Sequence, residues 1–267
     1  MPNNNWISVA HTDIGTVRKV NEDDFLDAPQ AGLWCVADGM GGHQKGDVAS
    51  RMIVDHLDNL GTQTALTPSS QQVKKSLLQV NNNLLELGMS LSDCAVIGST
   101  VAVLLFDQQN AHCIWAGDSR IYRLRQNTFT RLTTDHSQVQ EMVDSGMLTP
   151  EQAAAHPSGN VITRAIGASD DLELDQISVE LQRGDVFLLC SDGLNEVISD
   201  GEIANFLRTH PLQNVCDSLI QTALNRKVRD NVTVVTVCYR GTPQISGWGR
   251  LDVDSTVSLD NTVPMRR

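Results

Sequence analysis

Short apolar runs bounded by turn residues recur through the first and middle parts of the chain. Runs of this length and setting predict β-strands. Six of them precede residue 137, and their sequences are WISVAH, LWCVAD, STVAVLLF, AHCIWAGD, IYRLR and FTRLTT. Three later runs predict further strands, namely ELDQISVELQ, DVFLLCSDG and NVTVVTVCY, of which the last is apolar enough to be buried.

Two segments between the second and third of these runs have the period of an amphipathic helix instead. In residues 46–60 the apolar face consists of Val48, Met52, Ile53, Leu57 and Leu60. In residues 70–88 it consists of Val73, Leu77, Val80 and Leu84. A further pair of helices is predicted over about 200–225. Because helices lie before and after a block of consecutive strands, this order favours packed antiparallel sheets over a parallel βαβ sheet.

Two segments do not fit the regular pattern. Residues 137–159 have a weak helical pattern and predict a surface excursion from the main fold. Residues 241–267 have neither a helical nor a strand period, so they predict a tail that is mobile unless a partner orders it. We therefore expect one folded domain over residues 1–240, followed by this tail.

Charge and composition exclude several classes of partner. The 267 residues carry a formal net charge of −12, and no Lys/Arg stripe could follow a phosphate backbone, which argues against nucleic acid and anionic membranes. No long apolar run predicts a membrane span or a leader, so a cytoplasmic protein is expected. The six cysteines form no Cys-x-x-Cys pair, which favours buried, reduced thiols over zinc ligands or disulfides.

Several carboxylates lie at the ends of the apolar runs. Asp38, Asp118 and Asp192 each end such a run, and Asp230 opens the last one. Three more acids precede another short strand, and they are Glu22, Asp23 and Asp24. Each of Asp38 and Asp192 taken singly is typical of a turn, because Asp-Gly is a common turn pair. Four such positions with few neighbouring cations favour a shared cation site, since buried charge must be paired or bound.

The residue types at these positions indicate which ion is bound. Oxygen ligands without interspersed Cys or His favour a hard octahedral ion, Mg²⁺ or Mn²⁺, over zinc. Calcium remains open on ligand type alone, although no segment has the D-x-D-x-D-G spacing of a calcium loop.

Three other motifs are excluded by single residues. The GMGGHQKG segment has Gln44 where a dinucleotide loop needs Gly or Ala. It is not a P-loop either, because Lys45 precedes Gly46 instead of following a glycine. The VFLLCSDGL segment has Cys190 in the position where aspartyl-phosphate phosphatases carry their nucleophile.

Six motifs occur in order between Arg18 and Thr233, and they are RKVNED, ADGMGGH, GDSR, LTTDHS, SDGL and DNVT. Together they resemble the metal-dependent protein phosphatases (PPM), the type 2C serine/threonine phosphatases, in their compact bacterial form. The resemblance covers residues 5–240. It implies an α+β fold, a β-sandwich of two antiparallel sheets flanked by α-helices, with a metal cluster at one end. It also implies a monomeric phosphoprotein phosphatase that reverses a bacterial Ser/Thr kinase.

The resemblance further implies a set of metal ligands. Asp38 would bridge two Mn²⁺ or Mg²⁺ ions and orient the bridging water, and the Gly39 carbonyl would bind one of these ions. Asp192 and Asp230 would complete the other. Asp118, together with Asp192, would form a weaker third site. Such a pair of ions suits phosphate-monoester hydrolysis, because it can activate water and neutralise the phosphoryl oxygens.

Residues around these ligands are assigned by the same resemblance. Arg18 would bind the phosphate, since its planar fork donates two parallel hydrogen bonds. Glu22 and Asp23 would hold water on the metal ions. Glu196 would lie near the third site, and Asn231 is expected among the water-mediated positions.

The proton donor is where this sequence departs from part of the family. Many eukaryotic relatives have a histidine directly after the first Asp-Gly, and here that residue is Met40. His43 and His136 are the nearest candidate acids, although His43 near a helix start and His136 in a polar turn also fit structural roles. A water at the metal could supply the proton instead. Residues 137–159 would correspond to the family's flap, a region expected to govern substrate choice.

Two other functions remain compatible with the sequence. A pseudophosphatase would bind a partner through the same fold without turnover, although such proteins typically lose metal carboxylates and none is lost here. Alternatively, a metal-dependent hydrolase could keep the cluster and act on small phosphate esters or diesters.

Overall fold

The computed structural model describes residues 5–41, 45–63, 67–91, 96–154, 156–159 and 161–241. His43, Cys94 and residues 242–267 of the expected tail lie outside the described residues. The five described cysteines are free thiols, and four of them are buried. Among the described helices, none is both long and apolar enough to cross a membrane.

Two sheets form the centre of the molecule, and every strand pairing within them is antiparallel. In spatial order, the first sheet contains β1 (Trp6–Asp13), β11 (Val232–Tyr239), β10 (Val186–Cys190), β7 (Arg120–Arg125) and β8 (Thr128–Arg131). The second contains β2 (Asp23–Ala28), β3 (Leu33–Gly41), β5 (Val101–Phe106), β6 (Asn110–Ala116) and β9 (Asp175–Glu180), and β4 (Ile97–Ser99) pairs with β3. The strands predicted from the apolar runs are thus confirmed.

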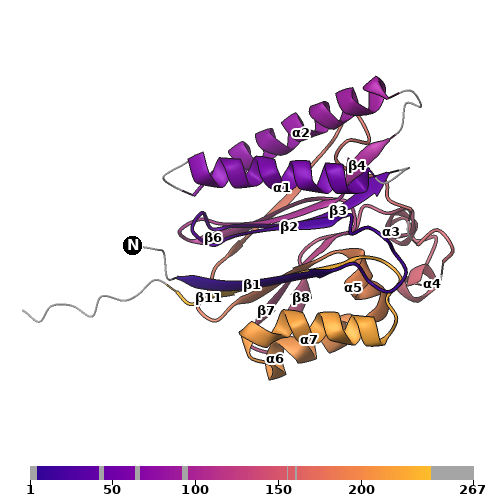
Figure 1. The fold of residues 1–267 in the computed structure, drawn as a ribbon. Helices are drawn as coiled ribbons and strands as arrows, with labels where there is room; N and C mark the ends of the chain where they lie inside the picture. The colour runs from indigo at the N-terminus through magenta and orange to yellow at the C-terminus, as the bar shows by residue number, and fades with distance from the viewer. Residues whose placement is uncertain are drawn as a thin grey trace, which may run out of the picture.

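Helices cover the outer face of each sheet, which gives four layers (Figure 1). The second sheet is covered by α1 (Gly46–Gln63) and α2 (Ser70–Ser90). The first sheet is covered by α5 (Asp192–Val197), α6 (Asp200–Thr209) and α7 (Leu212–Asn225). Two short helices, α3 (Gln138–Asp144) and α4 (Pro150–Ala154), lie at the right-hand end of Figure 1. The expected α+β sandwich is confirmed.

An aromatic cluster holds the two sheets together. Trp34 and Phe106 from the second sheet lie with their ring centroids 4.9 Å apart, edge to face. Trp6 and Phe187 from the first sheet contact the same Phe106 ring at 5.5 and 5.3 Å. Such packing adds to the burial of large apolar area. The packing between the two sheets is therefore largely apolar.

The predicted helix faces are correct for α2 and partly wrong for α1. All four predicted apolar residues of α2 are fully buried. In α1 the buried face is formed by Ala49, Ile53 and Leu57. Val48, which was predicted to belong to this face, is 40% exposed. Residues four apart lie on one helix face, as Ala49, Ile53 and Leu57 do. Val48 comes one residue before Ala49, so its side chain is rotated by about 100° from that face. The small side chain of Ala49 therefore fills the position expected for Val48.

Candidate functional site

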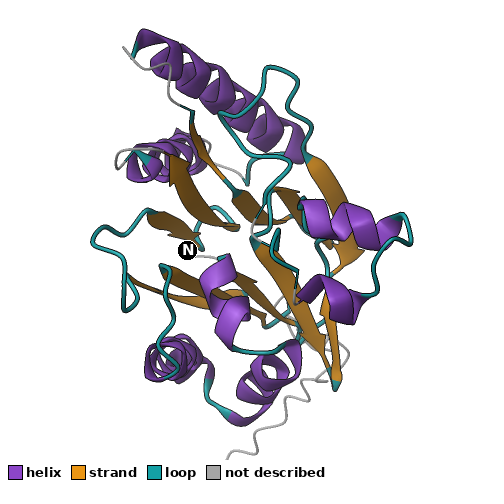
Figure 2. Cartoon of the chain, turned by 90° about the vertical axis from the view of Figure 1, so that its right-hand side faces the viewer, coloured by secondary structure: helices purple, strands orange, loops and turns teal. Residues whose placement is uncertain are grey.

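Five aspartates from separate parts of the chain lie close enough to influence one another's charge. The elements that carry them come together at the end of the sandwich where α3, α4 and α5 lie, on the right in Figure 1 and toward the viewer in Figure 2. Asp38 lies near the end of β3, and Asp23 opens β2 directly opposite it in the strand register. Asp192 begins α5 immediately after β10, Asp118 lies in the turn between β6 and β7, and Asp230 precedes β11. The antiparallel topology thus brings together the acids that the sequence pattern singled out.

Desolvation and mutual repulsion raise the pKa values of these acids. Burial is the largest cause for each of the four that follow, and the neighbouring aspartates add to it. The pKa of Asp38 is raised well above its ordinary value. The pKa is raised to about 7 for Asp23 and Asp118, and to about 6 for Asp192. These carboxylates are therefore close together without enough positive charge to compensate them.

Two buried carboxylate oxygens of the five clustered aspartates lack a hydrogen-bond partner. Asp23 is 7% exposed, and its Oδ2 accepts hydrogen bonds from Ser191 Oγ and Thr233 Oγ1, both at 2.7 Å. Its Oδ1 has no partner, and neither has Oδ1 of Asp118, which is 8% exposed. A buried polar atom without a partner is costly, and a bound cation would satisfy both. The donor set therefore fits a hard divalent ion.

The other carboxylates pair with neighbours inside the site. Asp38 and Asp192 lie close enough to interact electrostatically, and the charge of Asp192 contributes to the raised pKa of Asp38. Asp230 Oδ2 accepts from Arg18 Nη2 at 2.6 Å. In these side-chain conformations, no three His, Cys, Asp or Glu side chains of the described residues are arranged to hold an ion among them.

Glu22 and Gly39 connect the strand ends through their backbones. The Gly39 amide donates to the Glu22 carbonyl at 3.0 Å, and the Gly46 amide donates to Glu22 Oε1 at 3.1 Å. A methyl group built on Gly39 would overlap the Gly46 carbonyl oxygen. Only glycine therefore allows the end of β3 to lie this close to the start of α1.

Asn231 holds the loop between β1 and β2. Its Oδ1 accepts from the Glu22 amide at 2.8 Å, and its Nδ2 donates to the carbonyls of Ile14 and Val20 at 2.9 and 3.1 Å. The side chain predicted at a water-mediated position thus makes three direct bonds to backbone. It fixes the loop that carries Arg18.

His136 has a structural environment. Its Nδ1 accepts from the Gly117 amide at 3.1 Å, and its ring stacks on Trp115 with centroids 6.0 Å apart. Burial lowers the pKa of His136, so the ring is neutral with the proton on Nε2, which lies 3.3 Å from Asp175. Both ring nitrogens are engaged, which argues against a role as proton donor.

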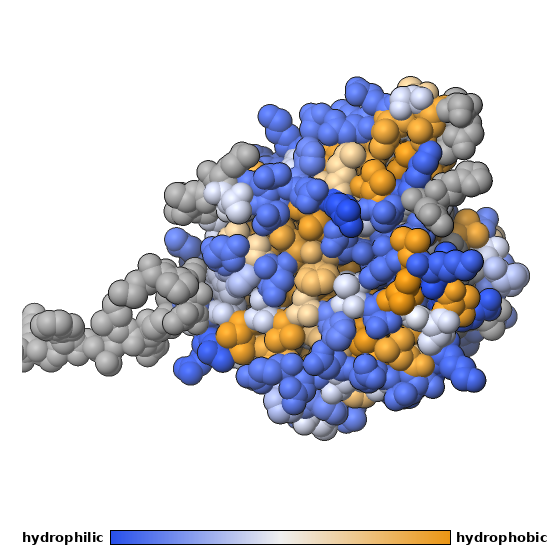
Figure 3. Space-filling view, viewed as in Figure 1, coloured by the Kyte–Doolittle hydropathy of each residue, from blue (hydrophilic) through white to orange (hydrophobic). Residues whose placement is uncertain are grey.

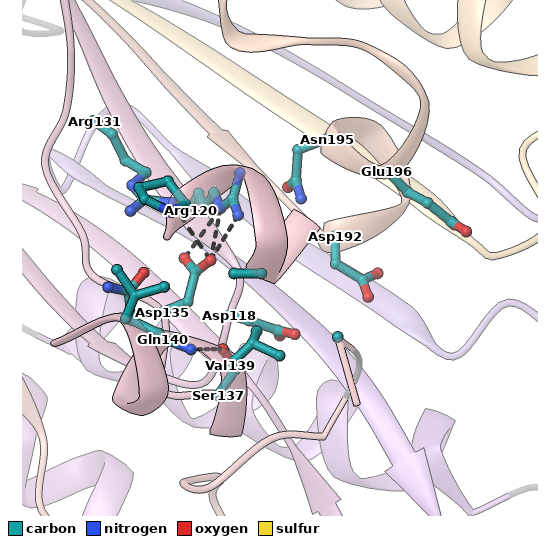
Figure 4. Close-up of a pocket in the computed structure, with 14 residues that line it drawn as sticks. Asp118, Arg120, Arg131, Asp135, Ser137, Val139, Gln140, Asp192, Asn195 and Glu196 are labelled. Atoms are coloured by element: carbon teal, nitrogen blue, oxygen red, sulfur yellow. Dashed lines mark hydrogen bonds and ion pairs between the residues drawn. The ribbon is translucent and has the colours of Figure 1, made fainter. Parts of the chain in front are cut away.

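A cavity of about 530 Å³ adjoins the acids and is drawn in Figure 4. Asp118 and Asp192 line it together with Asn195 and Glu196 of α5 and residues of α3 and α4. Segment 137–159, predicted as a flap, therefore contributes one wall. On the other side, Asp135 accepts from Arg120 Nη2 at 2.6 Å. Arg120 is thus engaged by Asp135, and its charge only partly offsets the effect of burial on the pKa values of Asp118 and Asp192, which stay raised.

Four hydroxyl side chains that support the acids were not predicted from the sequence. They are Thr100, Ser119, Ser191 and Thr233, and all are buried. A signal was present, because each is a polar residue inside or beside an apolar strand run, where a buried hydroxyl needs a partner. Which group each hydroxyl bonds to depends on the tertiary fold and could not be predicted from the sequence.

Without divalent metal, the protein is expected to lose stability as pH rises. The pKa values of Asp23, Asp118 and Asp192 are raised above their ordinary value of 3.8, so the folded state binds protons more tightly than the unfolded chain. Their contribution is present below about pH 4 and lost as pH rises through about 6 to 7. Urea unfolding with a chelator should therefore show a lower free energy of unfolding at about pH 8 than at about pH 5. A flat profile would contradict this, and saturating Mn²⁺ should restore stability at the higher pH.

The fold and the site define a four-layer α-β-β-α protein with an acidic centre at one end of its sandwich. The family model of protein phosphatase 2C matches residues 16–232, and the chain belongs to this family.

Named relatives agree with this assignment. The protein phosphatase PhpP of Streptococcus pneumoniae is 36% identical over 233 residues, which cover 85% of this chain and 94% of that protein. PppA of Pseudomonas aeruginosa, a key regulatory component of T6SS, is 40% identical with a TM-score of 0.76, and the match covers 87% of this chain and 97% of PppA. The catalytic domain of the serine/threonine protein phosphatase PstP, in complex with two manganese ions, is 32% identical with a TM-score of 0.78, over 87% of this chain and 97% of that domain.

Proposed function

We propose that this protein is a Mn²⁺- or Mg²⁺-dependent phosphatase that hydrolyses phosphoserine and phosphothreonine in proteins. The observation that carries the proposal is the group of desolvated, mutually repelling carboxylates with unpartnered oxygens on Asp23 and Asp118. The names of the relatives, which include serine/threonine phosphatases, support the same reaction.

The residues that would hold the ions are those of the acidic centre. Asp38, the Gly39 carbonyl, Asp192 and Asp230 would hold two core ions, and Asp118 with Asp192 would hold a weaker third. Oxygen donors of this kind suit Mg²⁺ and Mn²⁺. When bound, such ions supply a water activated for direct attack on phosphorus and neutralise the phosphoryl oxygens.

Arg18 is placed to bind the substrate phosphate. Its side chain is 49% exposed, on a loop beside the acids, and its guanidinium already reaches Asp230. The planar fork matches two phosphate oxygens. Among the described residues, Met40 has no proton to give and His136 is engaged by Gly117. The leaving alkoxide would therefore take its proton from water at the site or from His43, which lies outside the described residues.

Exposed apolar side chains near the site favour a polypeptide substrate. Val17 is 59% exposed beside Arg18, and Met147 is 69% exposed in the segment that lines the cavity. Figure 3 shows hydrophobic residues at the surface toward the right-hand end of the view. A cavity of about 530 Å³ leaves room for substrate side chains beyond the phosphate. We therefore propose a catalytic domain over residues 1–240 whose flap, residues 137–159, contacts the phosphoprotein.

We propose that the enzyme is a monomer and that it reverses phosphorylation by a bacterial Ser/Thr kinase. Its test is a comparison of a phosphothreonine peptide, a nucleotide and a phosphodiester at matched concentration with Mn²⁺. We expect the peptide to have the highest kcat/KM. Preference for the diester or nucleotide would replace the protein substrate with a small ester, and binding of the peptide without turnover would indicate a pseudophosphatase.

Replacing Arg18 with alanine is expected to raise KM for the phosphopeptide at least about tenfold, with a smaller effect on kcat, because a charge-assisted hydrogen bond to phosphate is lost. Arg18→Lys should recover only part of the loss, since an ammonium group lacks the planar fork. Arg183→Ala, an exposed arginine in the turn before β10, is the matched control. An unchanged KM in Arg18→Ala would show that Arg18 does not bind the substrate phosphate.

A further inference from the structure

Two buried hydroxyls link separate parts of the acidic centre. Thr100, between β4 and β5, is 0% exposed, and Ser119, directly after Asp118, is 2% exposed. Their Oγ atoms lie 2.7 Å apart and share a hydrogen bond. No role in binding or catalysis follows from the function proposed above for either residue. Their contact joins the second sheet to the turn that carries Asp118.

Thr100 also fixes the backbone of Asp38. The Asp38 amide donates to Thr100 Oγ1 at 3.2 Å, and the Thr100 amide donates to the Asp38 carbonyl at 2.9 Å. Ser99 Oγ donates to the same carbonyl at 2.9 Å. Residues 99–100 thus hydrogen-bond both the amide and the carbonyl of Asp38. Its backbone is fixed, and its carboxylate stays available to an ion.

The other side of Thr100 packs against the Asp118 turn. Gly117 has a φ of +109°, and a Cβ built on it would lie 2.6 Å from Thr100 Cβ and 2.7 Å from its Cγ2. The turn therefore lies directly against Thr100, and only glycine permits this approach. Thr100 contacts the Asp38 backbone through its hydroxyl and the Gly117–Asp118 turn through both its hydroxyl partner and its methyl group.

We propose that Thr100 and Ser119 are positioning residues that hold Asp38 and Asp118 in a fixed relative position, so that the core ligands and the outer carboxylate act as one ion-binding site. Neither hydroxyl is hydrogen-bonded to a carboxylate of the described residues. They act through the backbone of the two acids. The inference rests on the proposed function for what these acids bind. Functional groups must be held to within about 0.5 Å, and outer contacts of this kind tune metal affinity by about 10- to 100-fold.

The test measures Mn²⁺ affinity by isothermal titration calorimetry, with thermal unfolding alongside. Thr100→Val keeps the shape and loses the hydroxyl, whereas Thr100→Ser keeps the hydroxyl and loses the methyl group. We expect Thr100→Val to weaken Mn²⁺ binding by about tenfold. Thr100→Ser should remain within about threefold of the parent, because it preserves the hydrogen bond on which the positioning depends.

A double-mutant cycle with Ser119→Ala tests whether the two hydroxyls form one link. We expect the double variant Thr100→Val, Ser119→Ala to bind Mn²⁺ no more weakly than Thr100→Val alone, since that variant already breaks the contact between the two hydroxyls. Affinity losses that add would overturn the link. So would a Thr100→Val protein that unfolds at lower temperature but binds Mn²⁺ like the parent, because its hydroxyl would then serve folding alone. If Thr100→Val does not fold, Ser119→Ala decides, and parental Mn²⁺ affinity in it overturns the proposal.

The parent protein separates this inference from the proposed function. A parent that binds Mn²⁺ but does not hydrolyse a phosphothreonine peptide would overturn the phosphatase proposal, and the calorimetric cycle would still decide the role of the hydroxyls. A parent that binds no Mn²⁺ would overturn both.

Discussion

Replacing Asp192 with asparagine is expected to lower phosphothreonine-peptide hydrolysis at least about a thousandfold, because the ions supply several kcal/mol of charge stabilisation. The fold should survive this change. Asp192 lies close to the carboxylate of Asp38, and an amide of the same shape can donate a hydrogen bond to a carboxylate. In the presence of a chelator, the free energy of unfolding is therefore expected to stay the same or rise, since one of several repelling acids is removed.

The control for this variant is Asp171→Asn, an exposed aspartate outside the acidic centre. Steady-state kinetics with saturating Mn²⁺ and urea unfolding with a chelator measure the two quantities. Loss of activity together with loss of stability would indicate a structural carboxylate. Activity equal to that of the parent would exclude Asp192 from the catalytic centre.

Replacing Gly39 with alanine is expected to remove activity and to lower the free energy of unfolding by about 3 kcal/mol, at the upper end of overpacking costs. The added methyl group would overlap the Gly46 carbonyl oxygen and approach that of Glu22, and both are backbone atoms that cannot rotate away. The end of β3 must shift, and Asp38 shifts with it. Asp38 then loses its position opposite Asp23 in the strand register.

Gly201→Ala is the matched control, because a Cβ at Gly201 in α6 meets no atom within 4 Å. Alanine in a helix is favoured over glycine by about 0.5–1 kcal/mol, so this variant should be slightly more stable and fully active. Urea unfolding and peptide hydrolysis of both variants check the pair. A Gly39→Ala protein as stable and active as the parent would show that the approach of β3 to α1 is not required.

The local pattern of apolar and polar residues was sufficient to predict the strands and most of the helices. Alternating and continuous apolar runs do not depend on the tertiary partner, and α2 buries all four residues that its period indicates. The acids could be singled out because a charge at the end of an apolar strand is costly unless it is paired or bound. The order of elements predicted antiparallel sheets, but the strand order within each sheet and the register of Asp23 against Asp38 could not be predicted from it.

Short elements and long-range contacts could not be predicted. The helix α5 has six residues, which is too short for a period, so Asp192 was expected to end a strand and not to begin a helix. Asn231 was expected to act through water. Its side chain instead makes three hydrogen bonds to backbone groups, and these depend on how the β1–β2 loop folds over it. The Thr100–Ser119 contact likewise joins residues 19 apart whose strands meet only in the folded sheet.

Metal dependence of phosphopeptide hydrolysis tests the central claim most directly. The chelator-treated protein is assayed on a phosphothreonine peptide before and after Mn²⁺ is added, with Asp192→Asn in parallel. The structure predicts no turnover without metal, turnover with Mn²⁺ in the parent, and none in the variant under either condition. Equal turnover with and without the chelator, or no turnover of the parent with Mn²⁺, would contradict the assignment.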